Sequence, residues 1–363
     1  MGELEIDYFS KFKELQIETN PIYPRNDIGV ARLFFDLHSD AARYVIEAKS
    51  WYHFDGRRWK KDEGGFRVME MCKSFAESFV KYVEATANDK TFSKYAASFT
   101  GRKRREGILS DARSIKPMNI SMFDRNKNLF NCQNGTYDLA KMEFRPHSRS
   151  DFITNMAHVK FNAETKCERW ERFISEIMCG DADTARFLQK AFGYGLSGET
   201  NLECFFILYG SKTRNGKSTL TETIGNLMGD YSKTIQPQSL SKRSDNGASA
   251  SPDMARLKGA RLVNVAEPEK GLELNTALIK QLTGGDTYTG RLLYENSIEF
   301  KPEFKMYINT NHNKAHKLLH NLTRASPSDF PFYFYVLVCC SDNRNQTVND
   351  LPLVVKGSVF PIG

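Results

Sequence analysis

The residues best suited to chemistry form a glycine-bounded loop that follows a short apolar run and precedes a helical pattern. The loop runs from Gly210 to Thr219, reads GSKTRNGKST, and comes directly after the apolar segment 204–209. A strand, a glycine-rich loop, Lys-Ser and a helix in this order are the context of a Walker A motif. Backbone N–H groups of such a loop, together with the positive end of the helix dipole, attract phosphate oxygens. The pattern therefore predicts an ATP site.

Each residue of this cradle has an expected role. Lys217 is expected to neutralise the β- and γ-phosphates, Ser218 to ligate Mg²⁺, and Gly216 to allow close approach of the loop. Five residues separate Gly210 from Gly216 where the standard pattern has four. Either the loop carries one extra residue, or Ser211 stands at the first glycine position. Nucleotide contacts are expected from Gly210, Ser211, Asn215, Gly216, Lys217, Ser218 and Thr219.

Two later apolar segments end in polar residues that suit the same chemistry. Residues 262–266 lead into Glu267-Pro-Glu269, a Walker B arrangement, and residues 304–310 lead into Asn311. Glu267 is expected to hold a magnesium-bound water and Glu269 to polarise the attacking water, or the two roles are exchanged. Asn311 is expected to orient that water or to sense the γ-phosphate. The expected catalytic residues are Lys217, Glu267, Glu269 and Asn311, and the expected metal ligands are Ser218 and Glu267.

These residues need a sheet to bring them together. From about residue 200 onward, short apolar runs alternate with helical or polar stretches, which predicts a mostly parallel sheet with crossover helices. Upstream, the spacing predicts a helix capped by Asp27, a hairpin with its turn at Asp55-Gly56, a helix over 66–87, and a turn at Asn134-Gly135. The expected organisation is an irregular lead-in over 1–25, a mainly helical module over 26–198, a P-loop domain over 199–325 and an atypical tail over 326–363.

Composition sets the broad class. The chain has 363 residues, 40% apolar and 26% charged, and a run of about 18 apolar residues, which a membrane span needs, does not occur. The first 16 residues lack the apolar core of a signal peptide, so an intracellular protein is expected.

The net charge of +7 is compatible with nucleic acid. The basic run 101–105 is either solvated surface or a phosphate contact. Seven cysteines without a CxxC pair favour reduced thiols over a zinc site or a disulfide framework.

As a set, the motifs resemble the superfamily 3 helicases, and within them the phage/plasmid primase–helicase family. The resemblance covers roughly residues 26–312. In the P-loop part it rests on LYG…NGKST at 208–219, RLVNVAEPEKG at 261–271, ALIKQLTGGD at 277–286 and GRLLYENSIEFKPEFKMYINTNH at 290–312. Upstream, it rests on NDIGVARLF, WYHFDGRRWKKD, NLFNCQNGTYDL and FLQKAFGYGLSGET, which look like the helical module that precedes the helicase in this family.

The resemblance implies an AAA+-like ATPase that uses ATP and Mg²⁺, assembles as a homo-oligomeric ring, usually a hexamer, and unwinds DNA during replication of a mobile element. The implied location is the cytoplasm of a bacterial host, and the implied partners are single-stranded and duplex DNA. Its DNA-facing motif matches Lys280 and the stretch from Gly284 to Arg291. The basic residues Lys280, Arg291, Lys301 and Lys305 alternate with tyrosines, a mixture that either holds phosphates and stacks bases or forms a solvated face over an aromatic core.

Two departures from the family pattern matter. The chain has no room for a primase domain ahead of the helical module, so primer synthesis is not expected. After Asn311 the match ends, and Arg324 is the only arginine near the position of the family's arginine finger, in a different context. Such a finger is worth about three to five orders of magnitude in turnover in related enzymes. A changed reading frame or a truncation is one hypothesis for the tail.

Two alternatives to an active helicase stay open at this point. One is a nucleotide- and DNA-binding remnant that no longer unwinds, which the altered C-terminus motivates. The other is an AAA+-type remodeller of proteins, which would bind ATP equally well without salt-dependent affinity for DNA. The helicase-type spacing over residues 277–311 favours the DNA-directed functions.

Overall fold

The computed structural model describes residues 6–87, 89–210, 214–241, 252–267, 272, 274–291, 297–310 and 333–338. The chain divides into two compact units. The first contains residues 1–126 and 146–154, and the second contains residues 127–145 and 155–363. Each unit has its own buried apolar clusters, so each is described by itself.

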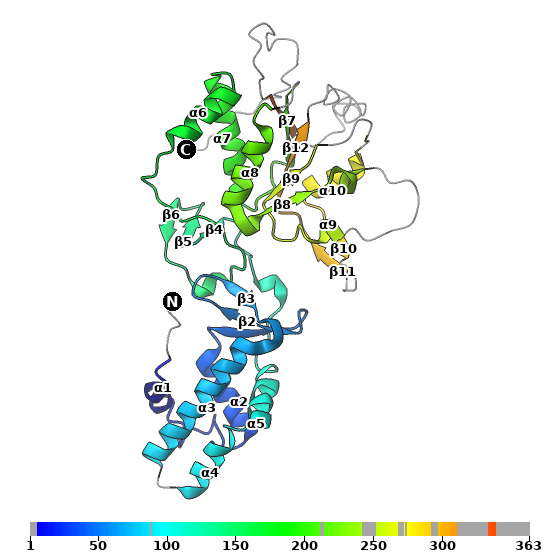
Figure 1. The fold of residues 1–363 in the computed structure, drawn as a ribbon. Helices are drawn as coiled ribbons and strands as arrows, with labels where there is room; N and C mark the ends of the chain where they lie inside the picture. The colour runs from blue at the N-terminus through cyan, green and yellow to red at the C-terminus, as the bar shows by residue number, and fades with distance from the viewer. Residues whose placement is uncertain are drawn as a thin grey trace. The chain divides into compact units, whose positions relative to one another are not determined.

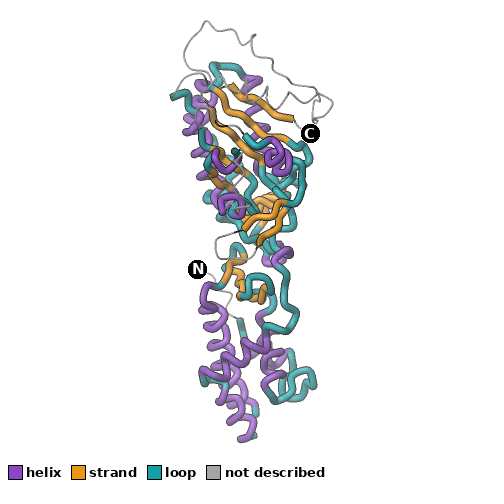
Figure 2. The backbone as a smooth tube through the Cα atoms, turned by 90° about the vertical axis from the view of Figure 1, so that its right-hand side faces the viewer, coloured by secondary structure: helices purple, strands orange, loops and turns teal. Residues whose placement is uncertain are grey.

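The first unit is mainly helical and carries one small antiparallel sheet in the order β1-β2-β3. Figures 1 and 2 show its long helices packed along one another, and α5 packs against both α2 and α3. Its elements are α1 (Tyr8–Glu14), α2 (Asp27–His38), β1 (Ala42–Val45), β2 (Ser50–Phe54), β3 (Trp59–Lys61), α3 (Phe66–Thr86), α4 (Lys90–Ser98) and α5 (Arg102–Ala112), with short 3-10 turns at Glu63–Gly65, Ile120–Met122 and Arg149–Asp151.

Local sequence explains most of these elements. The helix predicted over 66–87 and the hairpin with its turn at Asp55-Gly56 are confirmed by α3 and by β2–β3. The cap of α2 is Asn26 rather than Asp27, because the Asn26 side chain accepts a hydrogen bond from the Gly29 amide. The lead-in is not irregular throughout, since α1 forms within it and buries Phe12 against the aromatic side chains of α3.

The second unit is built on a five-stranded sheet in the order β13-β7-β12-β9-β8, with every neighbouring pair parallel. The strand that leads into the phosphate loop is β7, and β12 lies between it and β9. The strands are β7 (Cys204–Tyr209), β8 (Ser232–Ile235), β9 (Leu262–Val265), β12 (Lys305–Thr310) and β13 (Tyr333–Val338). Its helices are α6 (Glu168–Ile177), α7 (Ala182–Leu196), α8 (Lys217–Met228), α9 (Pro252–Ala255) and α10 (Thr276–Thr283), with 3-10 turns at Gly229–Tyr231 and Pro237–Leu240.

Both faces of this sheet are covered, as expected for a parallel sheet. Side chains alternate along β7 and β12, so that Phe206 and Tyr307 join one cluster with α7 and α8, and Ile207 and Ile308 join another with α9 and α10. Figure 1 shows these helix pairs on opposite sides of the sheet. Two antiparallel sheets complete the unit: β4 (Leu129–Cys132), β5 (Gly135–Asp138) and β6 (Glu143–Arg145), and the hairpin of β10 (Tyr288–Arg291) and β11 (Ser297–Phe300).

The structural division between the units does not fall at residue 198. Residues 155–198 belong to the same compact unit as the phosphate loop. The reason lies in the packing of α7 on the sheet: Phe192 stacks on Tyr307 with ring centroids 4.7 Å apart, and the Tyr307 hydroxyl donates to the Ala191 carbonyl at 2.7 Å. The fold class expected from the sequence is confirmed as a helical N-terminal region followed by an α/β unit with a parallel sheet.

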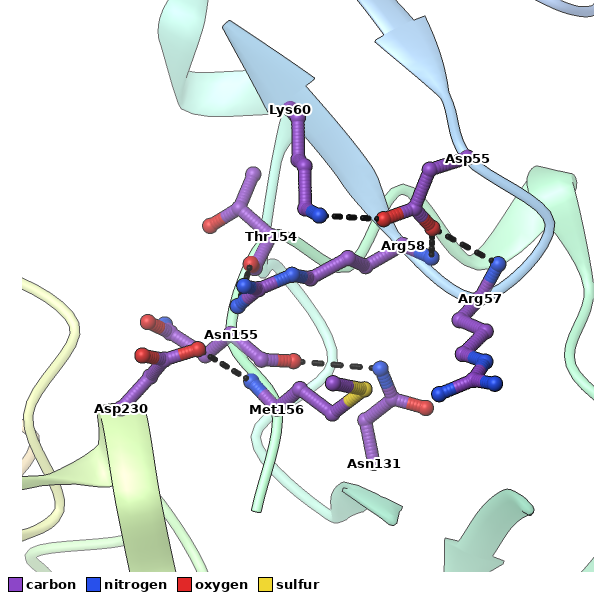
Figure 3. Close-up of polar contacts among 9 residues, drawn as sticks. All are labelled: Asp55, Arg57, Arg58, Lys60, Asn131, Thr154, Asn155, Met156 and Asp230. Atoms are coloured by element: carbon purple, nitrogen blue, oxygen red, sulfur yellow. Dashed lines mark hydrogen bonds and ion pairs between the residues drawn. The ribbon is translucent and has the colours of Figure 1, made fainter. Parts of the chain in front are cut away.

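The chain crosses from the first unit to the second at residues 154–155, and hydrogen bonds hold each side of the crossing to its own unit (Figure 3). In the first unit, Arg58 Nη1 donates to the Thr154 carbonyl at 3.2 Å. In the second, Asn131 Nδ2 donates to the Asn155 carbonyl at 3.1 Å, and the Met156 amide donates to Asp230 Oδ2 at 3.1 Å. Asp230 lies two residues after the last residue of α8, so that end of the helix is tied to the crossing segment. Among the described helices, none is long and apolar enough to span a membrane.

Candidate functional site

The phosphate loop joins β7 to α8, as the sequence predicts. All six residues of β7 are buried, and α8 begins at Lys217. Ser211 lies outside the described residues, as do its next two neighbours. The helix N-cap is Gly216, which has no side chain to cap the first amides, and the first turn of α8 holds no acidic residue. These N–H groups and the helix dipole therefore point toward the loop as an anion site.

Lys217 is placed to meet an anion at this helix end. Its side chain is 5% exposed, and its Nζ donates to the Asn215 Oδ1 at 2.8 Å. Ser218 and Thr219 are exposed at the start of α8, where a metal ion or a phosphate can reach their hydroxyls. Thr221 is buried and donates to the Lys217 carbonyl at 3.2 Å, which ties the first turn together. The loop thus carries the buried lysine and the accessible hydroxyl that a phosphate cradle requires.

Gly216 is required for two separate reasons. Its φ is +83°, in the region that side chains disfavour, and a Cβ there would lie 2.5 Å from Ile177 Cγ2 and 3.2 Å from Phe173 Cε2. Ile177 and Phe173 belong to α6, more than thirty residues upstream in the chain. The phosphate loop is therefore packed directly against α6, a contact that the sequence motif alone did not reveal.

The predicted acid lies at the same edge of the sheet as the loop. Val265 of β9 pairs with Ile308 of β12, and Thr310 of β12 pairs with Tyr209 of β7. Continuing this register by two residues sets Glu267 level with Tyr209, two strands away, or about 10 Å. Glu267 is exposed there. Glu269 and Asn311 lie outside the described residues, so their expected roles stay predictions.

An amide pair between β9 and β12 was missed from the sequence. Asn309 Nδ2 donates to Asn264 Oδ1 at 2.7 Å, and Asn309 is 8% exposed. The Asn309 Oδ1 is buried without a hydrogen-bond partner among the described residues. The signal that could have revealed this pair was an asparagine within each of two mostly apolar strand segments. The pair joins the strand that leads to Glu267 to the strand that leads to Asn311.

Lys305 was expected to contact DNA, and the structure contradicts this. Its side chain is 1% exposed, and its Nζ donates to the carbonyls of Ser197 at 2.5 Å and Glu199 at 3.0 Å. Arg261 is buried as well, and its guanidinium donates to the Leu196 carbonyl at 2.7 Å. Both cations therefore bind the carbonyls at and just beyond the C-terminal end of α7, where the helix dipole favours positive charge.

Burial shifts the pKa values of Lys305 and of its neighbour Cys204. Burial, together with the neighbouring positive charge of Arg261, lowers the pKa of Lys305 to about 7. Burial also raises the pKa of the adjacent Cys204 thiol to about 12, so that this thiol stays neutral. Lys305 thus holds α7 on the sheet and is closed to a nucleic acid.

The other expected DNA contacts belong to α10 and to the hairpin β10–β11 or the residue that follows it. Lys280 is half-buried on α10, and Lys301 is exposed just after β11. The backbone of Arg291 ends β10, but its side chain lies outside the described part of the chain, as does Arg324. Lys280 and Lys301 remain predictions for a DNA contact. In the described part of the chain, no group of three His, Cys, Asp or Glu side chains gathers. Mg²⁺ needs no such group, because it is usually bound by one or two carboxylates with substrate phosphates and waters.

Two family models match the chain, one in each half. Residues 31–179 match the model described as "D5 N terminal like", and residues 208–324 match "Family of unknown function (DUF5906)". The second match begins within β7 and contains the phosphate loop and Glu267.

The chain is also similar to viral proteins named as helicases. It is 27% identical over 281 residues to "Putative helicase L207/L206" of Acanthamoeba polyphaga mimivirus, which covers 71% of this chain and 29% of that protein. It is 32% identical over 141 residues to "Putative helicase 022R" of Frog virus 3 (isolate Goorha), 38% of this chain and 14% of that protein. The chain spans less than a third of the length of each of these two relatives.

Among solved structures, the chain is similar to the apo structure of the NrS-1 C terminal region (305-718), with a TM-score of 0.45 and 12% identity over 82% of this chain and 58% of that chain. The A form of the same region gives a TM-score of 0.44 and 13% identity over 85% and 59%. On the family models and the viral relatives, the resemblance to the phage and plasmid primase–helicase family is confirmed: residues 31–179 are similar to D5 N terminal like domains, and residues 208–324 are similar to the DUF5906 family.

Proposed function

We propose that this chain is the ATPase of a DNA helicase that acts in the replication of a phage, a plasmid or another mobile element. One observation carries the proposal: an uncapped helix N-terminus with the buried Lys217 lies at the same sheet edge as Glu267, two strands away. The names of the viral relatives support a helicase-like activity.

ATP with Mg²⁺ fits the residues at this edge. The N-terminal amides of α8 and the Lys217 ammonium would bind the β- and γ-phosphates, and the Ser218 hydroxyl and Glu267 would hold the metal. The ion would supply neutralisation of charge on the phosphate oxygens. Gly216 allows the loop to lie close to α6, because a side chain there would collide with that helix. Glu269 would then polarise the attacking water and Asn311 would orient it.

The remaining parts of the proposal follow the family resemblance. The chain would assemble as a homo-oligomeric ring, with part of each ATP site supplied by the next subunit. ATP binding would close the interface, hydrolysis would reopen it, and the hairpin β10–β11 with Lys280 and Lys301 would carry the DNA strand. The proposal does not include primer synthesis.

The decisive experiment measures phosphate release from ATP with and without single-stranded DNA. The expected result is turnover that single-stranded DNA stimulates. Lys217→Ala should lose ATP affinity and turnover together, whereas Glu267→Gln should keep most of the affinity and lose turnover. Lys81→Ala, on the exposed surface of α3, is the matched control and should resemble the wild type. If Lys217→Ala leaves ATP affinity and hydrolysis unchanged, the assignment of the site is wrong.

The same assay separates the alternatives. If the chain binds ATP but single-stranded DNA does not raise its ATPase activity, the chain is a nucleotide- and DNA-binding remnant. Turnover together with no salt-dependent affinity for DNA would identify a protein remodeller. Either result would refute the helicase proposal, but the assignment of the nucleotide site would still stand.

A further inference from the structure

Positive charge is concentrated on α4 and α5 of the first unit. Residues 90–116 contain eight lysine and arginine residues and two acidic residues. Lys90, Lys94, Arg102 and Lys103 are all exposed, and only three residues separate the end of α4 from the start of α5. The two consecutive helices therefore carry a basic segment with exposed side chains, called here the α4–α5 basic face and defined by these four residues.

The charges on this face oppose the stability of their own helices. The first turn of α5 reads Arg-Lys-Arg-Arg from Arg102 and contains no acidic residue. Cations near the positive end of a helix dipole are unfavourable, where an acid would gain about 0.3–1 kcal/mol. Lys90 and Lys94 lie four residues apart on α4, and like charges at this spacing cost about 0.2–0.5 kcal/mol. Exposed positions that break local rules without a structural gain, as Lys90, Lys94 and Lys103 do, are typical of functional surfaces.

Part of this charge is neutralised within the protein, and part is not. Arg104 pairs with Asp27 at 2.5 Å and so helps to pack α5 on α2. Arg102 Nε pairs with Glu106 at 2.8 Å, although its side chain is 85% exposed. Within the described residues, Lys90, Lys94 and Lys103 have no ion pair or side-chain hydrogen bond. These three ammonium groups are available to a partner.

A glycine beside these lysines leaves room for a bulky partner. Gly107 is exposed in the middle of α5, one turn after Lys103, and a Cβ there would meet nothing within 4 Å. A glycine inside a helix costs about 0.5–1 kcal/mol relative to alanine. The neighbouring atoms do not require it. Because Gly107 has no side chain, the protein surface beside Lys103 is lower, and a rigid partner could come closer to the helix there.

The chemistry of this face favours a nucleic acid over a membrane or an apolar protein surface. The exposed large apolar side chains of the described residues all lie outside 90–116. Stacking groups are not presented either, since Phe92 and Phe99 are buried and Tyr95 is half-buried. A surface of cations without exposed aromatic rings can bind phosphates but cannot stack unpaired bases.

We propose that the α4–α5 basic face binds the phosphate backbone of duplex DNA. Duplex DNA carries one charge per about 1.7 Å of helix axis, compared with about 3.4 Å for one of its strands, so it presents a dense array of phosphates. This surface belongs to the first unit, whereas the proposed nucleotide site and the hairpin β10–β11 belong to the second. The choice of DNA as the partner rests on the proposed helicase function, while the binding itself needs no ATP.

The test measures the salt dependence of binding by the full chain without nucleotide. Fluorescence anisotropy follows a labelled duplex of about 24 base pairs, and the corresponding single strand, from about 50 to 250 mM KCl. The test variant is Lys94→Ala with Lys103→Ala. The control is Lys13→Ala with Lys81→Ala, two exposed lysines on α1 and α3 of the same unit that change the net charge equally. Alanine is a good helix former, so all four substitutions should be compatible with folding.

For the duplex, log K falls as log salt rises. We expect the magnitude of this slope to be smaller by about 1.8 in the test variant, which is about 0.9 for each lost phosphate contact. The control should keep the wild-type slope, and Lys94→Arg with Lys103→Arg should keep it too. An unchanged slope in the test variant, or an equal loss in the control, overturns the proposal. A loss confined to the single strand overturns the assignment to duplex DNA. Because this readout needs no hydrolysis, it remains informative if the ATPase proposal fails.

Discussion

Gly216→Ala tests how the phosphate loop is built, because the substitution adds a single methyl group at its centre. The new Cβ would sit 2.5 Å from Ile177 Cγ2, on a backbone with φ of +83°. The backbone conformation alone costs a non-glycine residue about 1–2 kcal/mol. Overpacking against α6 adds about 1–3 kcal/mol. We therefore expect the second unit to lose about 2–5 kcal/mol of stability, with weaker ATP binding because the loop must move.

A control and a second substitution separate the two causes. Gly180 has a φ of +77° and nothing within 4 Å of its Cβ position, so Gly180→Ala should cost only the conformational part, about 1–2 kcal/mol. Ile177→Ala removes the colliding methyl group and by itself should cost about 2–5 kcal/mol. In the double variant the collision is relieved, so Gly216→Ala and Ile177→Ala should show a favourable coupling of about 1–3 kcal/mol.

Hydrogen-exchange mass spectrometry gives the readout. Peptides from α6 and α8 report the opening free energy of the second unit separately from that of the first. ATP-induced protection of α8 reports binding in the same experiment. The reasoning would be refuted if Gly216→Ala costs no more than Gly180→Ala, or if the effects of Gly216→Ala and Ile177→Ala add within about 0.5 kcal/mol.

Two further predictions concern the buried polar groups of the sheet. The pKa of Lys305 is about 7 in the folded chain, below the 10.5 of a free lysine. Between these values the unfolded chain binds more protons, so this group should make stability rise with pH by up to about 1.4 kcal/mol per pH unit. Urea unfolding from pH 7 to 9 should show this rise in the wild type but not in Lys305→Met, and equal slopes would contradict it. Asn309→Leu should cost about 1–3 kcal/mol because Asn264 loses its partner, whereas Asn264→Val with Asn309→Leu should be milder. Urea unfolding measures both, and a double variant as unstable as the summed single variants would count against a paired role.

The strand and helix that flank the proposed nucleotide site could be predicted because their signals are local in sequence. Strand, loop, lysine and helix follow one another within about 25 residues, and each signals itself by apolar runs, glycine or helical spacing. The turn at Asp55-Gly56 was predictable for the same reason, since a few adjacent residues decide it. The turn expected at Asn134-Gly135 lies one residue earlier, at residues 133–134, because Gly135 already pairs with Cys132 as the first residue of β5. The cap of α2 was misplaced by one residue, because Asn26 and Asp27 are both good caps and only the backbone distinguishes them.

Lys305 shows where prediction from sequence ends. In the sequence it stands among basic and aromatic residues, a pattern equally typical of a DNA contact and of a solvated surface. Its burial depends on the carbonyls of Ser197 and Glu199, more than a hundred residues earlier, which reach it only when α7 packs on the sheet. The amide pair of Asn264 and Asn309 likewise exists only because β9 and β12 become neighbours.

The sequence by itself determined the place of the glycine-bounded loop between a strand and a helix, the helical character of the first half and the alternation of strands and helices in the second. Tertiary structure decided the order of the strands, which sets Glu267 two strands from the loop, and the packing of α6 against Gly216. The physical reason is the range of the interactions. Hydrogen bonding along a helix and the conformations of a turn depend on residues a few positions apart. Strand order and burial depend on which distant apolar faces exclude water together.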